Sequence, residues 1–215
     1  MVKYGLRKVG IIIKPKDKGM SPQLDDIEAE ITYLLIREFK PETVVEISPC
    51  GGYSTSWILN ALNDNNHGKL YSFDIIDKVL TYLPKDLVKD NWTFVLGDVR
   101  DNLDKLPDKI DYLFMDSDHS HEFAVWYINN IFPKLKKDTL ISVHDVYYRN
   151  YDPNAINEGT TILKWLDDKK IEYFTVSPFY NKDINNKIIK FRKSLKIKWK
   201  TKPSNYNSMI YFFYK

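Results

Sequence analysis

Apolar residues recur along the chain in two patterns, which predict alternating strands and helices. Short runs rich in β-branched and aromatic residues predict strands at 43–47, 70–73, 92–96, 110–115, 139–143, 172–176 and 208–214. Apolar residues three or four positions apart predict helices over 24–39, 54–63, 122–135 and 156–168. Because the two kinds of element alternate, the pattern favours an α/β fold with a mostly parallel sheet.

The start of the first helix and the segment before the last strand carry further local signals. Ser21 and Pro22 suit the cap and first turn of the helix over 24–39, and Pro41 ends it. From Ser194 to Lys200, basic and apolar residues alternate with period two. That period predicts a strand or hairpin arm rather than a helix.

The length of 215 residues fits one domain over 1–215, with an N-terminal extension and helix at 1–40 and a basic insertion at 178–206. No apolar run approaches the roughly 20 residues of a membrane span. The chain has one cysteine, Cys50, which excludes an intramolecular disulfide and a cysteine-based zinc site. We therefore expect a cytoplasmic protein with no membrane partner.

The net charge of +3 is unevenly distributed. Between Phe179 and Asn205 nine basic residues face one acidic residue, so this segment carries about +8 and the remainder about −5. Lysines neutralise phosphates, so nucleic-acid binding by 182–202 is one interpretation. Charge runs are more often solvated, so we favour a solvated arm or a contact within a homodimer.

Five predicted strands end at an acidic residue. These residues are Glu46, which Ser48 follows closely, and Asp74, Asp98, Asp116 and Asp145. Each one alone is more often the cap of the next helix. In open α/β sheets, however, ligands bind outside the carboxyl ends of the strands, so the five together favour a site.

The turn after the first strand suits a nucleoside-containing ligand. Its glycines allow close approach of the backbone, and the N-terminus of the following helix attracts anionic groups. Asp74 follows Gly52 by 22 residues, a spacing at which a carboxylate accepts hydrogen bonds from ribose hydroxyls. The turn lacks Gly-x-Gly-x-x-Gly, which argues against an NAD oxidoreductase.

Three motifs carry a resemblance to a known family. Val-Val-Glu-Ile-Ser-Pro-Cys-Gly-Gly-Tyr-Ser-Thr (44–55) resembles motif I of class I methyltransferases. Ile-Asp-Tyr-Leu-Phe-Met-Asp-Ser-Asp-His-Ser-His-Glu (110–122) and the His-Asp strand end at 140–146 are similar to family-24 methyltransferases, which include sugar and small-molecule O-methyltransferases. The resemblance covers about 20–176. It implies a Rossmann-like class I fold, with a seven-stranded mostly parallel sheet, an antiparallel last strand and helices on both faces.

The resemblance also implies S-adenosyl-L-methionine as cofactor and a role for each matching residue. Glu46 would orient the turn and approach the methionine amino group, Asp74 would bind the ribose, and Asp98 would accept from the adenine amino group. The expected cofactor-binding residues are Glu46, Ser48, Gly52, Tyr53, Ser54, Asp74, Ile75, Gly97, Asp98 and Asp116. Ser48 replaces the first motif glycine and is followed by Pro49; it fits if its φ is negative.

Transfer of a methyl group to a hydroxyl needs a base or a metal. His119 is the preferred base, and Asp116 and His144 complete the expected catalytic residues. Asp116 and Asp145, with His144, would alternatively bind Mg²⁺ or another divalent cation. The competing interpretation is that Asp145 only caps the next turn.

We therefore expect methyl transfer to a hydroxyl of a small acceptor, a sugar or glycan in the first instance. Tyr147, Tyr148, Tyr151, Phe179 and Tyr180 lie in segments that would roof the acceptor pocket, or they simply pack there. The alternatives are an RNA methyltransferase that uses 182–202 and a non-catalytic Rossmann-like binding module.

Overall fold

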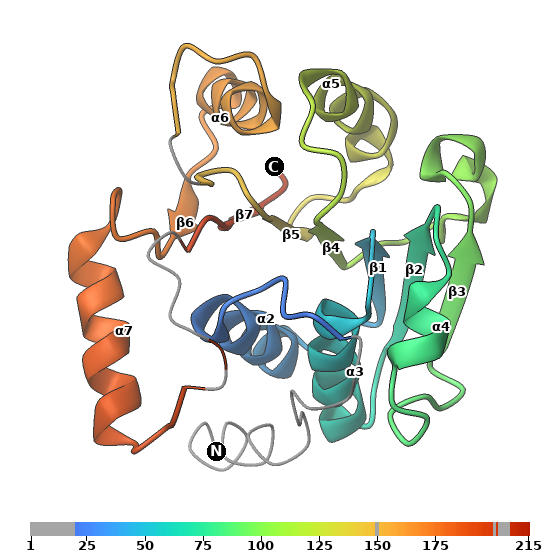
Figure 1. Ribbon diagram of the computed structural model, residues 1–215. Coiled ribbons are helices and arrows are strands. Elements are labelled where there is room, and N and C mark those ends of the chain that lie inside the picture. Colours follow the sequence, from blue (N-terminus) through green and yellow to red (C-terminus); the bar gives the residue numbers. More distant parts are fainter. Residues whose placement is uncertain (1–19, 149–150, 200, 202–206) are drawn as a thin grey trace.

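The computed structural model describes residues 20–148, 151–199, 201 and 207–215 and shows one seven-stranded sheet between helices (Figure 1). The strands are β1 (Thr43–Ile47), β2 (Lys69–Asp74), β3 (Trp92–Leu96), β4 (Tyr112–Met115), β5 (Leu140–Val143), β6 (Tyr173–Thr175) and β7 (Ile210–Phe213). The helices are α2 (Asp26–Phe39), α3 (Tyr53–Asn65), α4 (Lys78–Tyr82), α5 (His121–Asn130), α6 (Glu158–Lys169) and α7 (Lys182–Ser194).

The strand order is β3-β2-β1-β4-β5-β7-β6. Strands β1 to β5 pair in parallel, while β7 runs antiparallel between β5 and β6. The chain moves outward from β1 to β3 and then crosses back to β4 on the other side of β1. These findings confirm the expected Rossmann-like sheet with its antiparallel last strand, and they place the reversal of strand order between β1 and β4.

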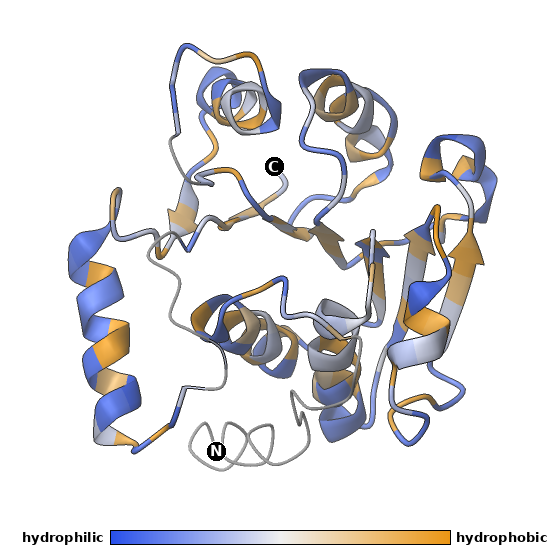
Figure 2. Cartoon of the chain, in the orientation of Figure 1, coloured by the Kyte–Doolittle hydropathy of each residue, from blue (hydrophilic) through white to orange (hydrophobic). Residues whose placement is uncertain are grey.

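Each strand sends alternate side chains to opposite faces, so the sheet separates two hydrophobic cores. Val44 packs with α2 and α3 on one face, and its neighbour Val45 packs with α5 and α6 on the other. Figure 1 shows these helix pairs on opposite sides of the sheet, and Figure 2 shows strands that are predominantly hydrophobic. The expected helices on both faces are therefore present.

Helix α2 begins later than predicted. Its N-cap is Asp25, whose carboxylate accepts from the backbone N–H groups of Ile27 and Glu28, while the Glu28 side chain accepts from the N–H of Asp25. This capping box satisfies N–H groups that the first helical turn leaves free. The predicted cap at Ser21 and Pro22 was wrong, because the better Asp-x-x-Glu signature lies four residues further on.

Other elements also differ from the pattern-based prediction. Helix α5 ends at Asn130 rather than 135, and a 3-10 turn at Phe132–Lys134 contains Pro133, which has no N–H to continue the helix. Strand β4 begins at Tyr112 rather than 110. The short helix α4 was not predicted, because five residues are too few to show a helical period.

The prediction of a strand or hairpin arm at 194–200 was wrong. Residues 182–194 form helix α7, and 195–199 contain no strand. The buried residues Asn185 and Arg192 lie two helical turns apart and hold the helix against the body. Asn185 donates to the carbonyl of Val176, and Arg192 pairs with Asp26 and Glu30 of α2. These partners are distant in sequence, so a local period does not reveal them.

Some predicted segments lie outside the described residues, namely 1–19 of the N-terminal extension and 200 and 202–206 of the basic insertion. Among the residues that are described, no helix combines the length and apolarity needed to cross a membrane.

The first turn of α6 packs tightly against the segment after β5, and this contact generates a stability prediction. A Cβ on Gly159 would lie 2.4 Å from the carbonyl oxygen of Val146. Alanine normally stabilises a helix by roughly 0.5–1 kcal/mol over glycine. Here we expect Gly159→Ala to destabilise by about 1–3 kcal/mol, because backbone must move.

Urea unfolding measures this effect, with Lys164→Ala in the exposed part of α6 as a near-neutral control. A raised unfolding midpoint for Gly159→Ala would contradict the close approach of the two segments.

Candidate active site

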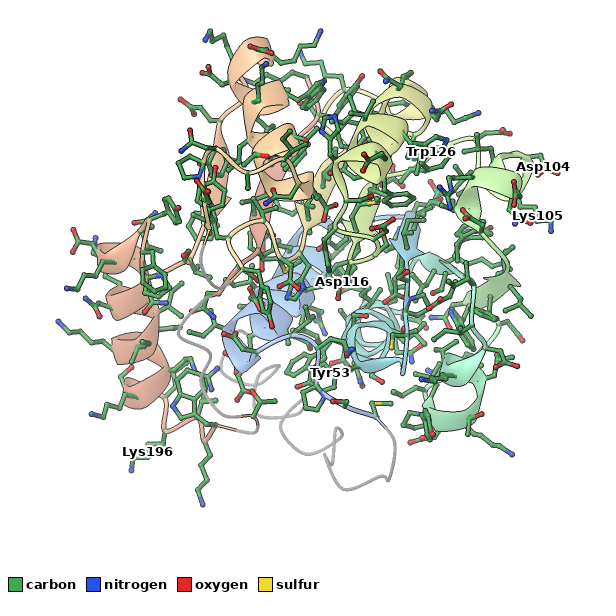
Figure 3. The ribbon with its side chains drawn as sticks, turned by 45° about the horizontal axis from the view of Figure 1, so that its top comes forward. Tyr53, Asp104, Lys105, Asp116, Trp126 and Lys196 are labelled. Carbon is green, nitrogen blue, oxygen red and sulfur yellow. The ribbon has the colours of Figure 1, made fainter. Side chains whose placement is uncertain are left out.

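A cleft of about 600 Å³ opens at the carboxyl edge of the parallel strands, where the strand order reverses. Ser48 lies just after β1, Asp74 ends β2, and Asp116 follows β4, at the centre of the view in Figure 3. The lining residues come from several segments: Ser21, Pro22, Gln23, Ser48, Cys50, Asp74, Ile75, Ile76, Asp116, Ser117, Asp118, His119, His144, Asp145 and Tyr148. The volume is within the range of small-molecule sites.

The turn between β1 and α3 is built from left-handed residues. Ser48, Cys50 and Gly52 have φ of 66°, 48° and 85°. Ser48 therefore does not meet the condition of a negative φ under which it was expected to fit, and its side chain costs roughly 1–2 kcal/mol in this conformation. The N–H of Ser48 donates to the carbonyl of Phe73 at 2.8 Å, which ties the turn to β2. At Gly52, the N-cap of α3, a Cβ would lie only 3.1 Å from Val79.

Glu46 lies in β1, immediately before this turn. It is completely buried, and its carboxylate accepts from the hydroxyls of Ser54 at 2.6 Å, Thr55 at 2.9 Å and Ser72 at 2.7 Å. Burial raises the pKa of Glu46 to about 7, against the lowering effect of the three hydroxyls. Glu46 and Ser54 therefore join β1, β2 and α3, and neither belongs to the lining of the cleft.

Asp74 presents a fixed carboxylate to the cleft. One oxygen accepts from the N–H of Cys50 at 2.8 Å and the other from the N–H of Ile76 at 3.1 Å. Each oxygen keeps a further lone pair for a ligand. Beside it, the side chain of Ile75 is 69% exposed and offers an apolar surface. Both predicted residues thus line the cleft, and their roles in cofactor binding remain predictions.

Other predicted cofactor residues lie elsewhere in this structure. Tyr53 is buried in α3, with its ring edge-on to Trp57. Asp98 caps the next 3-10 turn and pairs with Arg100, whose hydrogen bonds lower the pKa of that carboxyl. Gly97, which has a φ of 127°, precedes it. None of these three lines the cleft, so their roles in binding remain predictions.

Histidines and carboxylates from four segments meet on the far side of the cleft from Asp74. The imidazole of His144 is buried, with Nδ1 3.1 Å from Asp116 Oδ1 and 3.3 Å from Asp145 Oδ1. Its Nε2 lies 3.4 Å from Oε2 of Glu28 in α2. Burial disfavours the charged ring, but Asp116 and Glu28 outweigh burial and raise the pKa of His144 well above its usual value.

His119 lies at the mouth of the same cluster. Its Nε2 is 3.5 Å from Asp145 Oδ2 and 4.0 Å from Asp116 Oδ1, while its Nδ1 is 2.8 Å from Glu158 Oε2. Burial lowers the pKa of His119, and the carboxylate of Glu158 more than offsets that effect. By contrast, His121 turns away from the cleft to Thr161, with 2.7 Å between Nδ1 and Oγ1.

Two members of the cluster were missed by the sequence analysis. Glu28 occupies the third position of a capping box, and Glu158 is the first residue of α6 after the cap Asn157. Both positions are detectable as helix starts. Their contacts with His144 and His119 depend on how α2 and α6 pack on the sheet, and no local signal indicates that.

One group in the described part of the chain has the geometry of a cation site. Ligand atoms of Asp116, His144 and Asp145 all lie within 4.8 Å of one another. Two carboxylates and an imidazole are donors that suit Mn²⁺, Fe²⁺ or Zn²⁺ better than Mg²⁺. The structure thus brings together the three residues that the sequence offered as alternative metal ligands.

Comparison with known proteins agrees with this fold. Residues 45–146 match the family-24 model described as "Methyltransferase domain". A putative caffeoyl-CoA O-methyltransferase from Staphylococcus aureus is 12% identical, with a TM-score of 0.64 and coverage of 99% of this chain and 92% of that one. An O-methyltransferase from Bacillus cereus in complex with SAH is 13% identical, with a TM-score of 0.62 and coverage of 99% and 91%.

A third structure, the O-methyltransferase TomG from Streptomyces achromogenes in complex with SAM, is 15% identical. Its TM-score is 0.60, with 80% of this chain and 87% of that chain covered. No curated protein matches the chain. The chain thus has the class I methyltransferase fold.

The buried carboxyl of Glu46 predicts a dependence of stability on pH. In the unfolded chain a glutamate titrates near about 4.3, whereas the folded-state pKa is about 7. Between these values the folded protein holds a proton that the unfolded chain has released. Stability is therefore lost as pH rises from about 4.3 to about 7.

Urea unfolding of the native protein and Glu46→Gln at pH 5 and pH 8 isolates this effect. We expect the native protein to lose at least about 1 kcal/mol relative to the variant over that range. A difference between the two proteins that does not change with pH would show that Glu46 titrates normally.

Proposed function

We propose that this protein transfers a methyl group from S-adenosyl-L-methionine to a hydroxyl of a small acceptor. The observation that carries the proposal is the cleft itself. On one side it offers a fixed carboxylate suited to a ribose, and on the other a histidine–carboxylate cluster suited to deprotonating a hydroxyl. The family match and the similar structures in complex with SAM or SAH support the same cofactor.

The residues of the cleft fit this cofactor. Asp74 would accept hydrogen bonds from the ribose hydroxyls, beside the exposed side chain of Ile75. Ser48 and Asp116 flank the point of strand reversal and would hold the methionine end. When bound, S-adenosyl-L-methionine supplies an electrophilic methyl group on its sulfonium. The protein then needs to align the acceptor and remove its proton.

His119 would take the proton of the acceptor hydroxyl. Its side chain is 44% exposed at the cleft, whereas that of His144 is 6% exposed. His119 is therefore accessible to an acceptor, and His144 lies behind Asp116 and Asp145. Deprotonation by a positioned base typically contributes about 10²–10⁴-fold to rate.

A divalent cation held by Asp116, His144 and Asp145 would lower the pKa of the acceptor hydroxyl. The carboxyl groups of Glu28 and Glu158 lie just outside this set, so four carboxyl groups surround two histidines. Such an excess of acidic groups favours a bound cation at this position. The metal is therefore included in the proposed mechanism as an aid to His119.

A sugar or glycan is the acceptor we would test first. Tyr148 lines the cleft, and Tyr147 behind it stacks on Tyr180 with ring centroids 3.8 Å apart. Tyr151 contacts both of those rings edge-on. Of these four tyrosines, Tyr148 is the one that lines the cleft, and its ring suits a sugar face or an aromatic ring.

RNA is less favoured as an acceptor. No described lysine of the basic segment lines the cleft, and Lys196 lies at the edge of the molecule, far from Asp116, in Figure 3. A non-catalytic binding module is also less favoured, because it would not need the cluster of His119, Asp116 and Asp145 beside its cleft. A homodimer, which the sequence analysis offered as a role for the basic segment, remains a prediction.

Loss of the Asp74 charge tests the cofactor site. We expect Asp74→Asn to weaken binding of S-adenosylhomocysteine at least about 10-fold, because it loses charge-assisted hydrogen bonds to the ligand. Isothermal titration calorimetry measures this change, with the exposed Asp167→Asn as control. Unchanged affinity, or no binding to the native protein, would reject the cofactor site.

Removal of the cation tests the metal. We expect EDTA to reduce methyl transfer to a sugar acceptor and Mn²⁺ to restore it, with Asp145→Asn insensitive to both. Asparagine tolerates the left-handed conformation of Asp145, whose φ is 55°, so this variant should retain its backbone. Native activity that survives EDTA, together with full activity of Asp145→Asn, would exclude a metal-assisted reaction.

A further inference from the structure

Helix α6 holds His119 through two separate contacts made by its first residue. The backbone N–H of Glu158 donates to the carbonyl of His119 at 3.0 Å, and the carboxylate of Glu158 lies 2.8 Å from Nδ1 of the same residue. Main chain and ring are therefore both fixed from one position. A histidine that projects freely from a surface loop would have neither of these contacts.

The place of Glu158 is itself fixed by its neighbours. Asn157 caps α6 in a capping box with Thr160, and Gly159 allows the helix to approach Val146 closely. Glu158 is 2% exposed, so its carboxylate cannot swing into solvent. The N-terminus of α6 is thus held between the segments that follow β4 and β5, which carry His119 and Asp145.

The neutral ring of His119 can carry its proton on Nδ1 or on Nε2. The distances from these two nitrogens to the surrounding carboxylates favour one position. Glu158 lies 2.8 Å from Nδ1, whereas the nearest described carboxylate oxygen to Nε2 is that of Asp145 at 3.5 Å. The shorter contact makes a normal hydrogen bond and the longer one does not. The neutral ring therefore carries its proton on Nδ1, and Nε2 offers its lone pair to the cleft.

We propose that Glu158 is the positioning residue of the reaction, which holds His119 in the tautomer and orientation that let Nε2 accept the acceptor's proton. This inference rests on the proposed function, in which His119 is the base. In the transfer, the O–H bond of the acceptor breaks, its proton passes to Nε2, and the oxygen forms a bond to the methyl carbon as the carbon–sulfur bond breaks. The charge of Glu158 then stabilises the imidazolium.

The Glu158→Gln variant tests this role in the full-length protein. Its amide can donate to Nδ1 and so stabilise the wrong tautomer, and we expect kcat to fall at least about 10²-fold. Affinity for S-adenosylhomocysteine should stay within about twofold, because Glu158 does not line the cleft. Glu158→Asp retains the charge and should recover part of kcat. The matched control is Thr161→Val, which removes the parallel contact of α6 with His121 outside the cleft.

Two further measurements keep the inference testable if a variant is unstable or the acceptor is not found. In a His119→Ala background, Glu158→Gln should have no additional effect on kcat, because a residue that acts through His119 is silent without it. Independently of activity, ¹⁵N NMR of the ring should show protonated Nδ1 in the native protein and protonated Nε2 in Glu158→Gln, at a pH where the ring is neutral.

The outcomes separate the two proposals. If the native protein transfers methyl groups and Glu158→Gln retains kcat within about twofold, the positioning role is wrong while the proposed function stands. If the NMR tautomer is the same in both proteins, the pairing itself is wrong. If the tautomer changes as expected but the native protein binds no S-adenosylhomocysteine, the pairing is supported and the proposed function fails.

Discussion

The reversal of strand order between β1 and β4 is the constraint on which the site depends. The connections that follow β1 and β4 leave towards opposite edges of the sheet, so neither of them covers the carboxyl ends of this pair. The cleft occupies that space, and each parallel strand that borders it contributes the residue at its end. Asp74, Asp116 and Asp145 are up to 71 residues apart in the chain, yet they lie around one opening.

The carboxyl groups around this opening differ in what they contact. Glu46 accepts hydrogen bonds from three hydroxyls and so joins β1 to β2 and to the first turn of α3. Asp74, with its carboxylate fixed by two backbone N–H groups, faces the cleft instead. The two carboxyl groups are both buried, but only that of Asp74 lines the cleft. The carboxyl of Glu46 is used within the fold, and that of Asp74 remains available to a ligand.

The two histidines beside the cleft have the same arrangement of partners. His119 and His144 each present one ring nitrogen to Asp116 and Asp145, and each has a buried glutamate at the other nitrogen. The glutamates come from helices on opposite faces of the sheet, α6 and α2. Packing of both helix layers therefore sets the geometry of the histidines, which connects the stability of the two cores to the chemistry proposed for the cleft.

The sequence by itself determined the α/β architecture, the parallel sheet and most of the cleft. Strand ends are local features, and the carboxyl ends of parallel strands must share one edge, so Asp74, Asp116 and Asp145 could be placed together from the pattern alone. Only the tertiary structure decided what joins that edge from elsewhere. Glu28 and Glu158 look like ordinary helix starts, α7 is held by ion pairs to α2, and the turn conformation of Ser48 follows from its contact with β2. Such contacts join residues that are far apart in the chain, and short-range periodicity carries no information about them.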